Sequence, residues 1–305
     1  MVAAGPLIRL VVGAYAAQAV CVAARLGVAD VLATGPQPVD VIARRVGAHE
    51  PALYRLLRAL GDVDVVAELD DRSFALTPLG ETLRSDAPGS LRAWATLVGM
   101  PFWHRSWSEL YDGVRTGEVP FDRVNGADFF SYLAENPDDA NTFESGFTAM
   151  YTYRNIFGTY DLSRFDTIVD VGADSGDVLA DILSANPHLR GVPFDAQDAE
   201  GDVYLLSGML HGASDDEAVK ILGTCRAAMP DTACLLVAET VLPDGSRPSV
   251  GKFMDLQMLV FTADGRFRTE SEFRSLLDQA GFRVVRIVPS SDIVSLVEAV
   301  PVGSK

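Results

Sequence analysis

The alternation of apolar strand-like runs with helices after Phe165 constrains the fold of this 305-residue chain more than any other feature. FDTIVDVG is typical of a buried strand, and a helix is predicted over Asp177 to Ser184. GVPFD, DVYLLSGML and CLLVAETVL follow as strands, with helices over Asp215 to Met229 and Glu270 to Ala280, before the closing pair RVVRIVP and IVSLVEAV. This order predicts a parallel, doubly wound α/β sheet. Its C-terminal edge is expected to be an antiparallel hairpin.

The first 95 residues show a different pattern, mostly helical and rich in alanine and leucine. Helices are predicted over Tyr15 to Leu26, ended by Gly27, over Val39 to Val46, and over Pro51 to Leu60. VVAELDDRSFALTP then reads as two short strands around a turn. Helix, helix and hairpin together predict a winged helix. Residues 96 to 160 are predicted to hold further helices dense in aromatic residues, which either pack in the core or form the walls of a pocket for a flat organic ligand.

The charge balance argues against nucleic acid as a partner of the winged helix. Lys plus Arg number 25 and Asp plus Glu number 42, which gives a net charge of −17. Between Pro36 and Gly80 five basic residues stand against seven acidic ones. A helix that enters the major groove should be basic on its outer face. Neither nucleic acid nor an anionic membrane surface is therefore expected as a partner.

Cysteine and histidine content favours a cytoplasmic protein without a metal site. The three cysteines form no CxxC pair and the four histidines are scattered, which fits a reducing compartment. No cluster has metal-ligand spacing. The longest apolar stretch near the start, Leu10 to Ala24, is about 15 residues, shorter than the roughly 20 that span a bilayer. No basic segment precedes it, so a signal peptide is not expected either.

The glycine-containing turn after the first strand of the sheet is the motif most closely tied to chemistry. It reads Asp170-Val171-Gly172-Ala173-Asp174-Ser175-Gly176. Glycine in such a turn lets the backbone approach a ligand closely, and the amino terminus of the next helix favours negative charge. Two glycines in one turn are common, but doubly wound folds bind ligands at this position. The turn is therefore a candidate cofactor site.

Several segments, in order along nearly the whole chain, resemble the small-molecule O-methyltransferases that use S-adenosylmethionine, of the plant caffeate type and the bacterial polyketide-tailoring type. These are AARLGVADVLA, ALYRLLRALGDV, FALTPLGETLRSDAPGSLRAW, VDVG with the later glycine, YLLSGMLH, LLVAETVLPDG and RTESEF. The resemblance implies a winged-helix dimerisation domain over residues 1–95, a helical linker and pocket region over 96–160, and a Rossmann-like class I methyltransferase domain over 161–305. It also implies a homodimer and a small hydrophobic substrate bound between the domains.

The resemblance assigns roles to particular residues. His211 matches the family's general base, a role that suits a neutral imidazole, and Glu239 matches the acid that orients it. The cofactor-binding positions are Asp170, Gly172, Gly176 and Asp195. The expected substrate-binding positions are Trp103, His104, Met150, Tyr153, Met254, Asp255, Met258 and Phe267. For the methionines core packing stays open, and for Asp255 a capping role does.

Four departures from the family pattern bear on the cofactor. Ala173 and Asp174 replace glycines in the turn, and a carboxylate there would face the carboxylate of the donor's methionine part. Seven residues separate Asp195 from the strand at Val203, too few for a crossover of a dozen or more. An edge βα unit that encloses the adenine is therefore expected to be missing. The family's His-Asp-Trp becomes His211-Gly212-Ala213, and Phe267 stands where a second catalytic acid is expected.

These departures favour an enzyme that kept the cavity and the histidine but lost methyl transfer. The favoured function is a cyclisation, isomerisation or elimination of a hydrophobic, polyketide-like intermediate in antibiotic biosynthesis, with no required cofactor. The first alternative is a methyltransferase that uses S-adenosylmethionine and acts on a phenolic or enolic hydroxyl, with His211 as general base. The second alternative is a non-catalytic partner of an active homologue.

Overall fold

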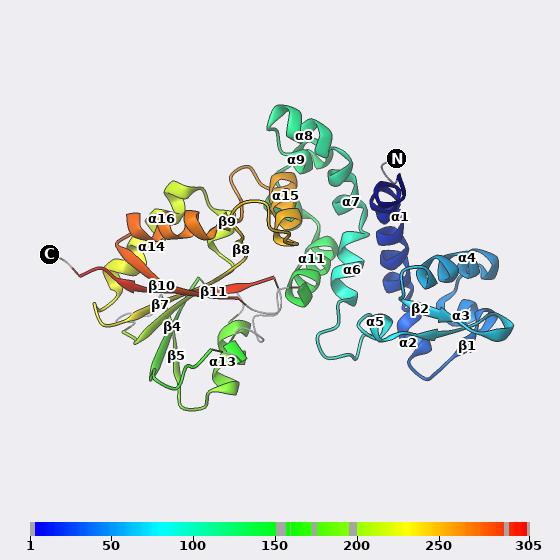
Figure 1. The fold of residues 1–305 in the computed structure, drawn as a ribbon, viewed down its shortest axis with the longest axis horizontal. Coiled ribbons are helices and arrows are strands. Elements are labelled where there is room, and N and C mark those ends of the chain that lie inside the picture. Colours follow the sequence, from blue (N-terminus) through cyan, green and yellow to red (C-terminus); the bar gives the residue numbers. More distant parts are fainter. Residues whose placement is uncertain are drawn as a thin grey trace. The chain divides into compact units, whose positions relative to one another are not determined.

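The chain is divided into two units by its own backbone contacts. The computed structural model describes residues 4–150, 157–158, 160–172, 176–194, 200–289 and 293–303. The N-terminal unit comprises Met1–Ser108 with Phe129–Thr152, and the C-terminal unit comprises Glu109–Asp128 with Tyr153–Lys305 (Figure 1). The segment 96–160, expected as one region, is therefore shared between the two units. The domain boundaries drawn from the sequence stay a prediction.

The N-terminal unit contains the predicted winged helix. Its first part consists of α1 (Ala4–Leu26), α2 (Val28–Leu32), β1 (Gln37–Pro38), α3 (Val39–Val46), α4 (Glu50–Gly61), β2 (Val66–Glu68), β3 (Ser73–Leu76) and α5 (Pro78–Glu81). The predicted hairpin forms, because β2 and β3 pair antiparallel and β1 adds to the other side of β3. Leu53, Leu57 and Leu60 recur at helical spacing on α4 and are buried in the core of this unit.

Helix α1 is longer than the sequence pattern predicted. It begins at Ala4 rather than Tyr15 and ends before Gly27, whose φ of +71° closes it as expected. Leu7 and Leu10, in its first half, are 66% and 77% exposed, whereas Ala23 and Ala24 are buried. The segment Gly5–Leu26 is long and apolar enough to cross a membrane by length and composition alone. The expected limit of about 15 apolar residues is therefore wrong, although core helices and signal sequences pass the same test.

An aromatic cluster packs the second part of the N-terminal unit. That part consists of α6 (Arg92–Val98), α7 (Pro101–Ser108), α10 (Phe129–Glu135) and α11 (Pro137–Met150). Trp103 is 2% exposed and lies 6.0 Å from Trp94 and 6.3 Å from Phe143, ring centre to ring centre. Phe143 in turn lies 4.9 Å from Phe129. Edge-to-face and stacked contacts of this kind join α6, α7, α10 and α11.

The C-terminal unit is built on the predicted doubly wound sheet. Its strands are β4 (Thr167–Val171), β5 (Arg190–Pro193), β6 (Val203–Ser207), β7 (Cys234–Glu239), β10 (Phe282–Pro289) and β11 (Ser295–Pro301). They lie in the order β10-β11-β7-β6-β4-β5, with β5, β4, β6 and β7 parallel and the β10–β11 hairpin antiparallel. The direction of winding reverses between β4 and β6, the position where such folds bind ligands.

The sheet ends at β5, as the short connection after Asp195 predicts. In the described part of the sheet β5 pairs with β4 alone, and the chain then returns to begin β6 on the other side of β4. Gly201 makes this return possible, because a Cβ there would lie 2.6 Å from Cγ2 of Val169 and 3.0 Å from the carbonyl oxygen of Thr167. The chain thus lies directly against β4, and among the described residues no further strand or helix follows β5 at this edge.

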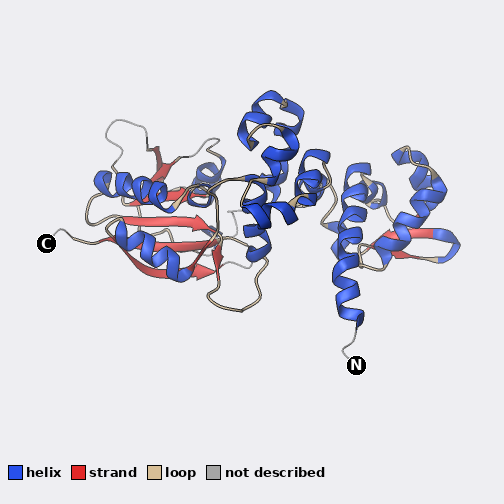
Figure 2. Ribbon diagram, turned by 90° about the horizontal axis from the view of Figure 1, so that it is seen from above, coloured by secondary structure: helices blue, strands red, loops and turns tan. Residues whose placement is uncertain are grey.

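Helices cover both faces of this sheet. α14 (Asp215–Ala228) and α16 (Glu270–Gln279) share one hydrophobic core with β6, β7 and the hairpin, and α13 (Asp177–Ala185) packs near β5 on the opposite face (Figure 1). Figure 2 shows the strands gathered in this unit. The run CLLVAETVL, predicted as one strand, is divided at Thr240 into β7 and β8 (Val241–Leu242), which pairs with β9 (Arg268–Thr269).

Three further helices complete the C-terminal unit. They are α8 (Leu110–Thr116), α9 (Pro120–Asn125) and α15 (Gly251–Phe261). Phe121 on α9 packs on Phe261 of α15, with ring centres 5.4 Å apart. This contact fixes α15, the helix that carries Met254, Asp255 and Met258.

Candidate active site

His211 and Glu239 form a buried pair at the carboxyl ends of neighbouring parallel strands. His211 lies in a short 3-10 turn, Leu210–Gly212, just beyond β6, and Glu239 is the last residue of β7. Nδ1 of His211 lies 2.9 Å from Oε2 of Glu239. Oε1 of the same carboxylate accepts the backbone N–H groups of Leu210, at 2.7 Å, and of His211, at 3.2 Å. One carboxylate therefore fixes both the imidazole and the backbone that carries it.

The tautomer and charge of His211 follow from this arrangement. A carboxylate only accepts hydrogen bonds, so Nδ1 carries the hydrogen and Nε2 holds the basic lone pair. Burial is the largest single influence on the pKa of His211 and lowers it. The charge of Glu239 and its hydrogen bond together outweigh burial, and the pKa is raised above its ordinary value, although Arg268 lowers it. An imidazole whose proton affinity is increased in this way has the chemistry that a general base needs.

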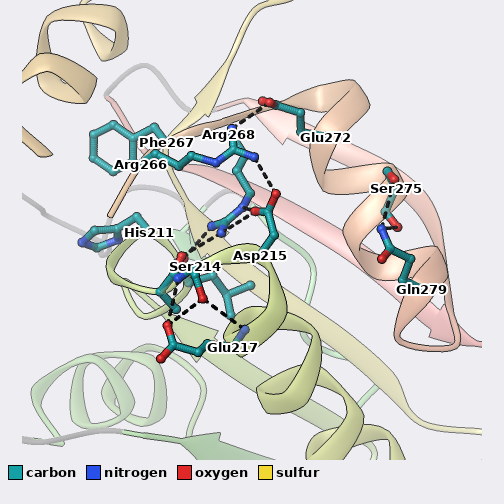
Figure 3. Close-up of polar contacts among 12 residues, drawn as sticks. His211, Ser214, Asp215, Glu217, Arg266, Phe267, Arg268, Glu272, Ser275 and Gln279 are labelled. Atoms are coloured by element: carbon teal, nitrogen blue, oxygen red, sulfur yellow. Dashed lines mark hydrogen bonds and ion pairs between the residues drawn. The ribbon is translucent and has the colours of Figure 1, made fainter. Parts of the chain in front are cut away.

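Phe267 and Asp255 complete the surroundings of the histidine. The ring of Phe267 is 3% exposed and its centre lies 5.3 Å from that of the imidazole (Figure 3). Oδ1 of Asp255 accepts the backbone N–H of Phe267 at 2.8 Å. The two roles expected for Asp255, substrate binding and capping, are thus joined by a third, because its carboxylate binds the loop before β9.

The glycine turn brings a different acid to the same edge of the sheet. Asp170 lies in β4 and is 3% exposed. Within the described residues, both of its carboxylate oxygens are buried without a hydrogen-bond partner, as is Oγ1 of Thr240. Burial raises the pKa of Asp170 to about 6. A buried acid without a partner is costly in a ligand-free protein and fits a ligand that carries positive charge or hydrogen-bond donors.

The described ends of the turn fit the close approach of a ligand. Gly172 and Gly176 have φ of +78° and +72°, values that favour glycine. A Cβ at Gly172 would collide with the side chain of Met209, whereas one at Gly176 would meet nothing within 4 Å. Gly176 also caps the amino terminus of α13. Together with Asp170, these residues fit S-adenosylmethionine, which offers an ammonium group, a sulfonium charge and ribose hydroxyls.

The remaining expected site residues fall into three groups. Met254 and Met258 are buried on α15, at 7% and 8% exposure, in the same unit as His211. Trp103, His104 and Met150 belong to the N-terminal unit, where Trp103 is in the aromatic cluster, His104 is exposed and Met150 ends α11. Tyr153 and Asp195, like Ala173 and Asp174, lie outside the described residues. Their assignment to the site stays a prediction.

Sequence reasoning missed Arg268, which the structure places beside His211. Arg268 is 1% exposed and forms hydrogen bonds with the chain on both sides of that histidine. Its only sequence signal is its position in RTESEF, where Thr269 and Glu272 form a capping box that starts α16. That signal marks a helix start and says nothing about the arginine before it.

Two family models match the chain. The O-methyltransferase dimerisation domain matches residues 8–86, and the O-methyltransferase domain matches residues 107–199 and 194–283. The second match therefore consists of two segments that overlap at residues 194–199, in the connection between β5 and β6. Dimerisation domain, class I methyltransferase fold and the site at its carboxyl edge together define the class of protein. The chain belongs to the family of O-methyltransferases that depend on S-adenosylmethionine.

Individual relatives cover nearly the whole chain. It is 35% identical to the phenazine O-methyltransferase PhzM of Lysobacter antibioticus, over 97% of this chain and 96% of the relative. That alignment spans 329 positions, more than this chain has residues. It is 37% identical to the O-demethylpuromycin-O-methyltransferase of Streptomyces alboniger, over 97% and 89%. CalO1, a methyltransferase of calicheamicin biosynthesis solved with S-adenosylhomocysteine, superimposes with a TM-score of 0.88 and 28% identity over 98% of both chains.

These findings overturn two expectations. The favoured non-methylating cyclisation, isomerisation or elimination is wrong, since the relatives are methyltransferases, and so is the expectation that no cofactor is required. The error came from giving too much weight to the lost edge unit. That loss lies beyond β5, whereas Asp170 and Glu239 lie in the central strands β4 and β7, Gly172 directly follows β4, and His211 lies in the turn just beyond β6. The missing unit therefore leaves this part of the site in place.

Proposed function

We propose that this chain transfers a methyl group from S-adenosylmethionine to a phenolic or enolic hydroxyl of a small aromatic natural product. The observation that carries the proposal is the hydrogen bond between Nδ1 of His211 and Glu239, because it leaves Nε2 as the proton acceptor. Two relatives, a phenazine O-methyltransferase and an O-demethylpuromycin-O-methyltransferase, support the substrate class. The place of CalO1 in calicheamicin biosynthesis supports a place in natural-product biosynthesis.

Each residue of the proposed site has a defined part in this reaction. Asp170 and the backbone at Gly172 and Gly176 would hold the donor, which supplies a methyl group on a sulfonium sulfur. Nε2 of His211 would take the proton of the substrate hydroxyl and so make its oxygen a nucleophile for that methyl group. Glu239 orients the ring and stabilises the imidazolium that forms. Phe267, Met254 and Met258 supply apolar surface for a flat substrate.

The exposed half of α1 supports the homodimer that a dimerisation domain implies. Leu7, Leu10 and Tyr15 are 66%, 77% and 72% exposed, and the matched dimerisation region begins at residue 8. A contiguous apolar surface of this kind marks an interaction site. We propose that a second copy of the chain covers it. Leu10→Glu should shift the protein from dimer to monomer in light scattering, and an unchanged dimer would contradict this assignment.

One assay tests the proposed reaction directly. The purified protein is titrated with S-adenosylhomocysteine in a calorimeter, then incubated with S-adenosylmethionine and a panel of hydroxyarenes that includes a hydroxyphenazine. Binding in the micromolar range and a mass gain of one methylene group in a panel compound are expected. Glu270→Gln, on the exposed start of α16, is the control and should leave both unchanged. An absence of binding would refute the proposal.

A further inference from the structure

Arg268 holds the segment that carries His211 from the side opposite Glu239. Nη1 of Arg268 donates to the carbonyl oxygen of Leu210 at 2.6 Å, and Nη2 donates to that of Ala213 at 2.8 Å. Nε donates to Oδ1 of Asp215 at 2.9 Å, the first residue of α14 (Figure 3). One guanidinium therefore binds the chain just before His211, just after it, and at the start of the next helix.

The neighbouring residue adds a further contact to the same segment. The backbone N–H of Arg266 donates to the carbonyl oxygen of His211 at 2.8 Å. Three of the four carbonyl groups from Leu210 to Ala213 are thus bound by residues 266–268. The N–H groups of Leu210 and His211 are bound by Glu239. The backbone around the proposed base is held on both sides, which is what a precise proton transfer needs.

A contribution to stability does not by itself explain why an arginine is buried at position 268. Its side chain is 1% exposed, while that of its counter-ion Asp215 is 54% exposed. A buried charge costs free energy that well-packed apolar residues of similar volume avoid. The planar fork of an arginine, however, can bind two carbonyl oxygens and a carboxylate at fixed geometry, which no apolar residue and no lysine can do.

We propose that Arg268, with Asp215 as its counter-ion, is a positioning residue that fixes the backbone of His211 and so aims its imidazole at the substrate hydroxyl. The proposal rests on the proposed function for the role of His211, but the contacts themselves do not depend on it. Arg268 has no direct part in the reaction, because its donors are directed at the protein's own carbonyl and carboxylate oxygens.

The charge of Arg268 has an effect of its own on His211. The charged groups around this histidine are Glu239 on β7, Arg268 on β9, Arg266 and Asp255 near the loop before β9, and Asp215 on α14. Glu239 raises the pKa of the imidazole and Arg268 lowers it. Removing the positive charge of Arg268 should therefore raise the pKa, and a lysine at this position should largely preserve it.

NMR of the histidine side chains tests the effect of Arg268 on His211 without a substrate. The chain has four histidines, so the 15N imidazole signals of the full-length protein can be assigned with the variant His211→Gln. In the wild type, one tautomer with hydrogen on Nδ1 is expected. In Arg268→Met, His211 should titrate at higher pH than in the wild type and show a second tautomer. In Arg268→Lys, His211 should titrate as in the wild type but also show the second tautomer, because the planar guanidinium is lost.

Turnover provides the second measurement. With the hydroxyarene that the wild type methylates best, Arg268→Met should lower kcat about 100-fold and Arg268→Lys about 10-fold, with KM for the donor changed less than about threefold. Arg226→Met is the matched control. Arg226 is a partly buried arginine near the other end of α14 that binds Asp231 and carbonyl oxygens, and its loss should lower Tm and leave kcat unchanged.

The outcomes separate this proposal from the proposed function. A folded Arg268→Met whose His211 titration, tautomer and kcat equal those of the wild type would show that Arg268 only stabilises the fold. If Arg268→Met does not fold, Arg268→Lys and Asp215→Asn decide by the same measurements. If the wild type methylates no panel compound, the proposed function fails, while a changed tautomer in Arg268→Lys would still support the positioning role.

Discussion

Two buried acids at the same edge of the sheet differ in the hydrogen bonds that their carboxylates accept. Glu239, at the end of β7, accepts three hydrogen bonds from His211 and Leu210. The carboxylate of Asp170, near the end of β4, accepts no hydrogen bond from the described part of the protein. The region around Glu239 is organised before any ligand binds, as a catalytic group must be. The region around Asp170 is incomplete until a ligand provides donors, as a binding site can be.

The largest effect is expected from removing the base in the organised region. His211→Gln should lower kcat about 1,000-fold, because general base catalysis contributes roughly 10²–10⁴-fold. The affinity for S-adenosylhomocysteine should not change, since we propose that the donor binds in the Asp170 region. Steady-state kinetics and calorimetry measure both. A loss of donor affinity as large as the loss in kcat would remove the distinction between the two regions.

Glu239→Gln should have the next largest effect, about 100-fold on kcat. The amide can donate to Nδ1 and so favours the wrong tautomer of His211. Glu239 raises the pKa of His211, so its loss should move the rising limb of the pH profile of kcat/KM to lower pH, because the imidazole must lose its proton to act as a base. A limb that stays in place would show that another group titrates there.

Asp170→Asn should weaken donor binding and stabilise the ligand-free protein. Burial raises the pKa of Asp170 from 3.8 to about 6, so the folded state loses stability as the pH rises from about 4 to 6, and the asparagine avoids this loss at pH 7. We expect a higher Tm and a free energy of unfolding raised by about 1–3 kcal/mol. Binding of S-adenosylhomocysteine should be roughly tenfold weaker. Asp181→Asn, on α13, is a control, and a lower Tm for Asp170→Asn would contradict this account.

The smallest effect is a pH dependence of donor affinity. A ligand with positive charge or donors favours the ionised form of Asp170, so the affinity for S-adenosylmethionine should fall as the pH drops below about 6. Calorimetry between pH 5 and pH 8, run on His211→Gln so that the histidine does not contribute, measures this directly. Asp170→Asn in the same background should give a flat profile. A slope that survives in this double variant would point to another group.

The sequence was sufficient for the order of strands and helices and for the pair His211 and Glu239. Strand alternation, Gly27 and the glycines of the turn are local signals, and seven residues after Asp195 are too few for a crossover. Arg268 could not be found in this way, because its partners Leu210 and Ala213 lie more than fifty positions earlier in the chain. The division of CLLVAETVL at Thr240 likewise depends on the pairing of β8 with β9.

The function was harder to predict than the fold, for a physical reason. Ala173, Asp174 and Phe267 depart from the family pattern, but a binding site tolerates the loss of some contacts when others remain. Whether a contact is essential depends on its neighbours in space. The partnerless carboxylate of Asp170 is visible only once the strands on both sides of β4 are in place.

The loss of a βα unit also uncovers a row of backbone groups along β5. Such a row can recruit strands from other molecules and lead to aggregation. Here the newly outermost strand has four residues, begins with the exposed charge of Arg190 and ends with Pro193, which has no N–H to offer. These features oppose the addition of a strand from another molecule to β5.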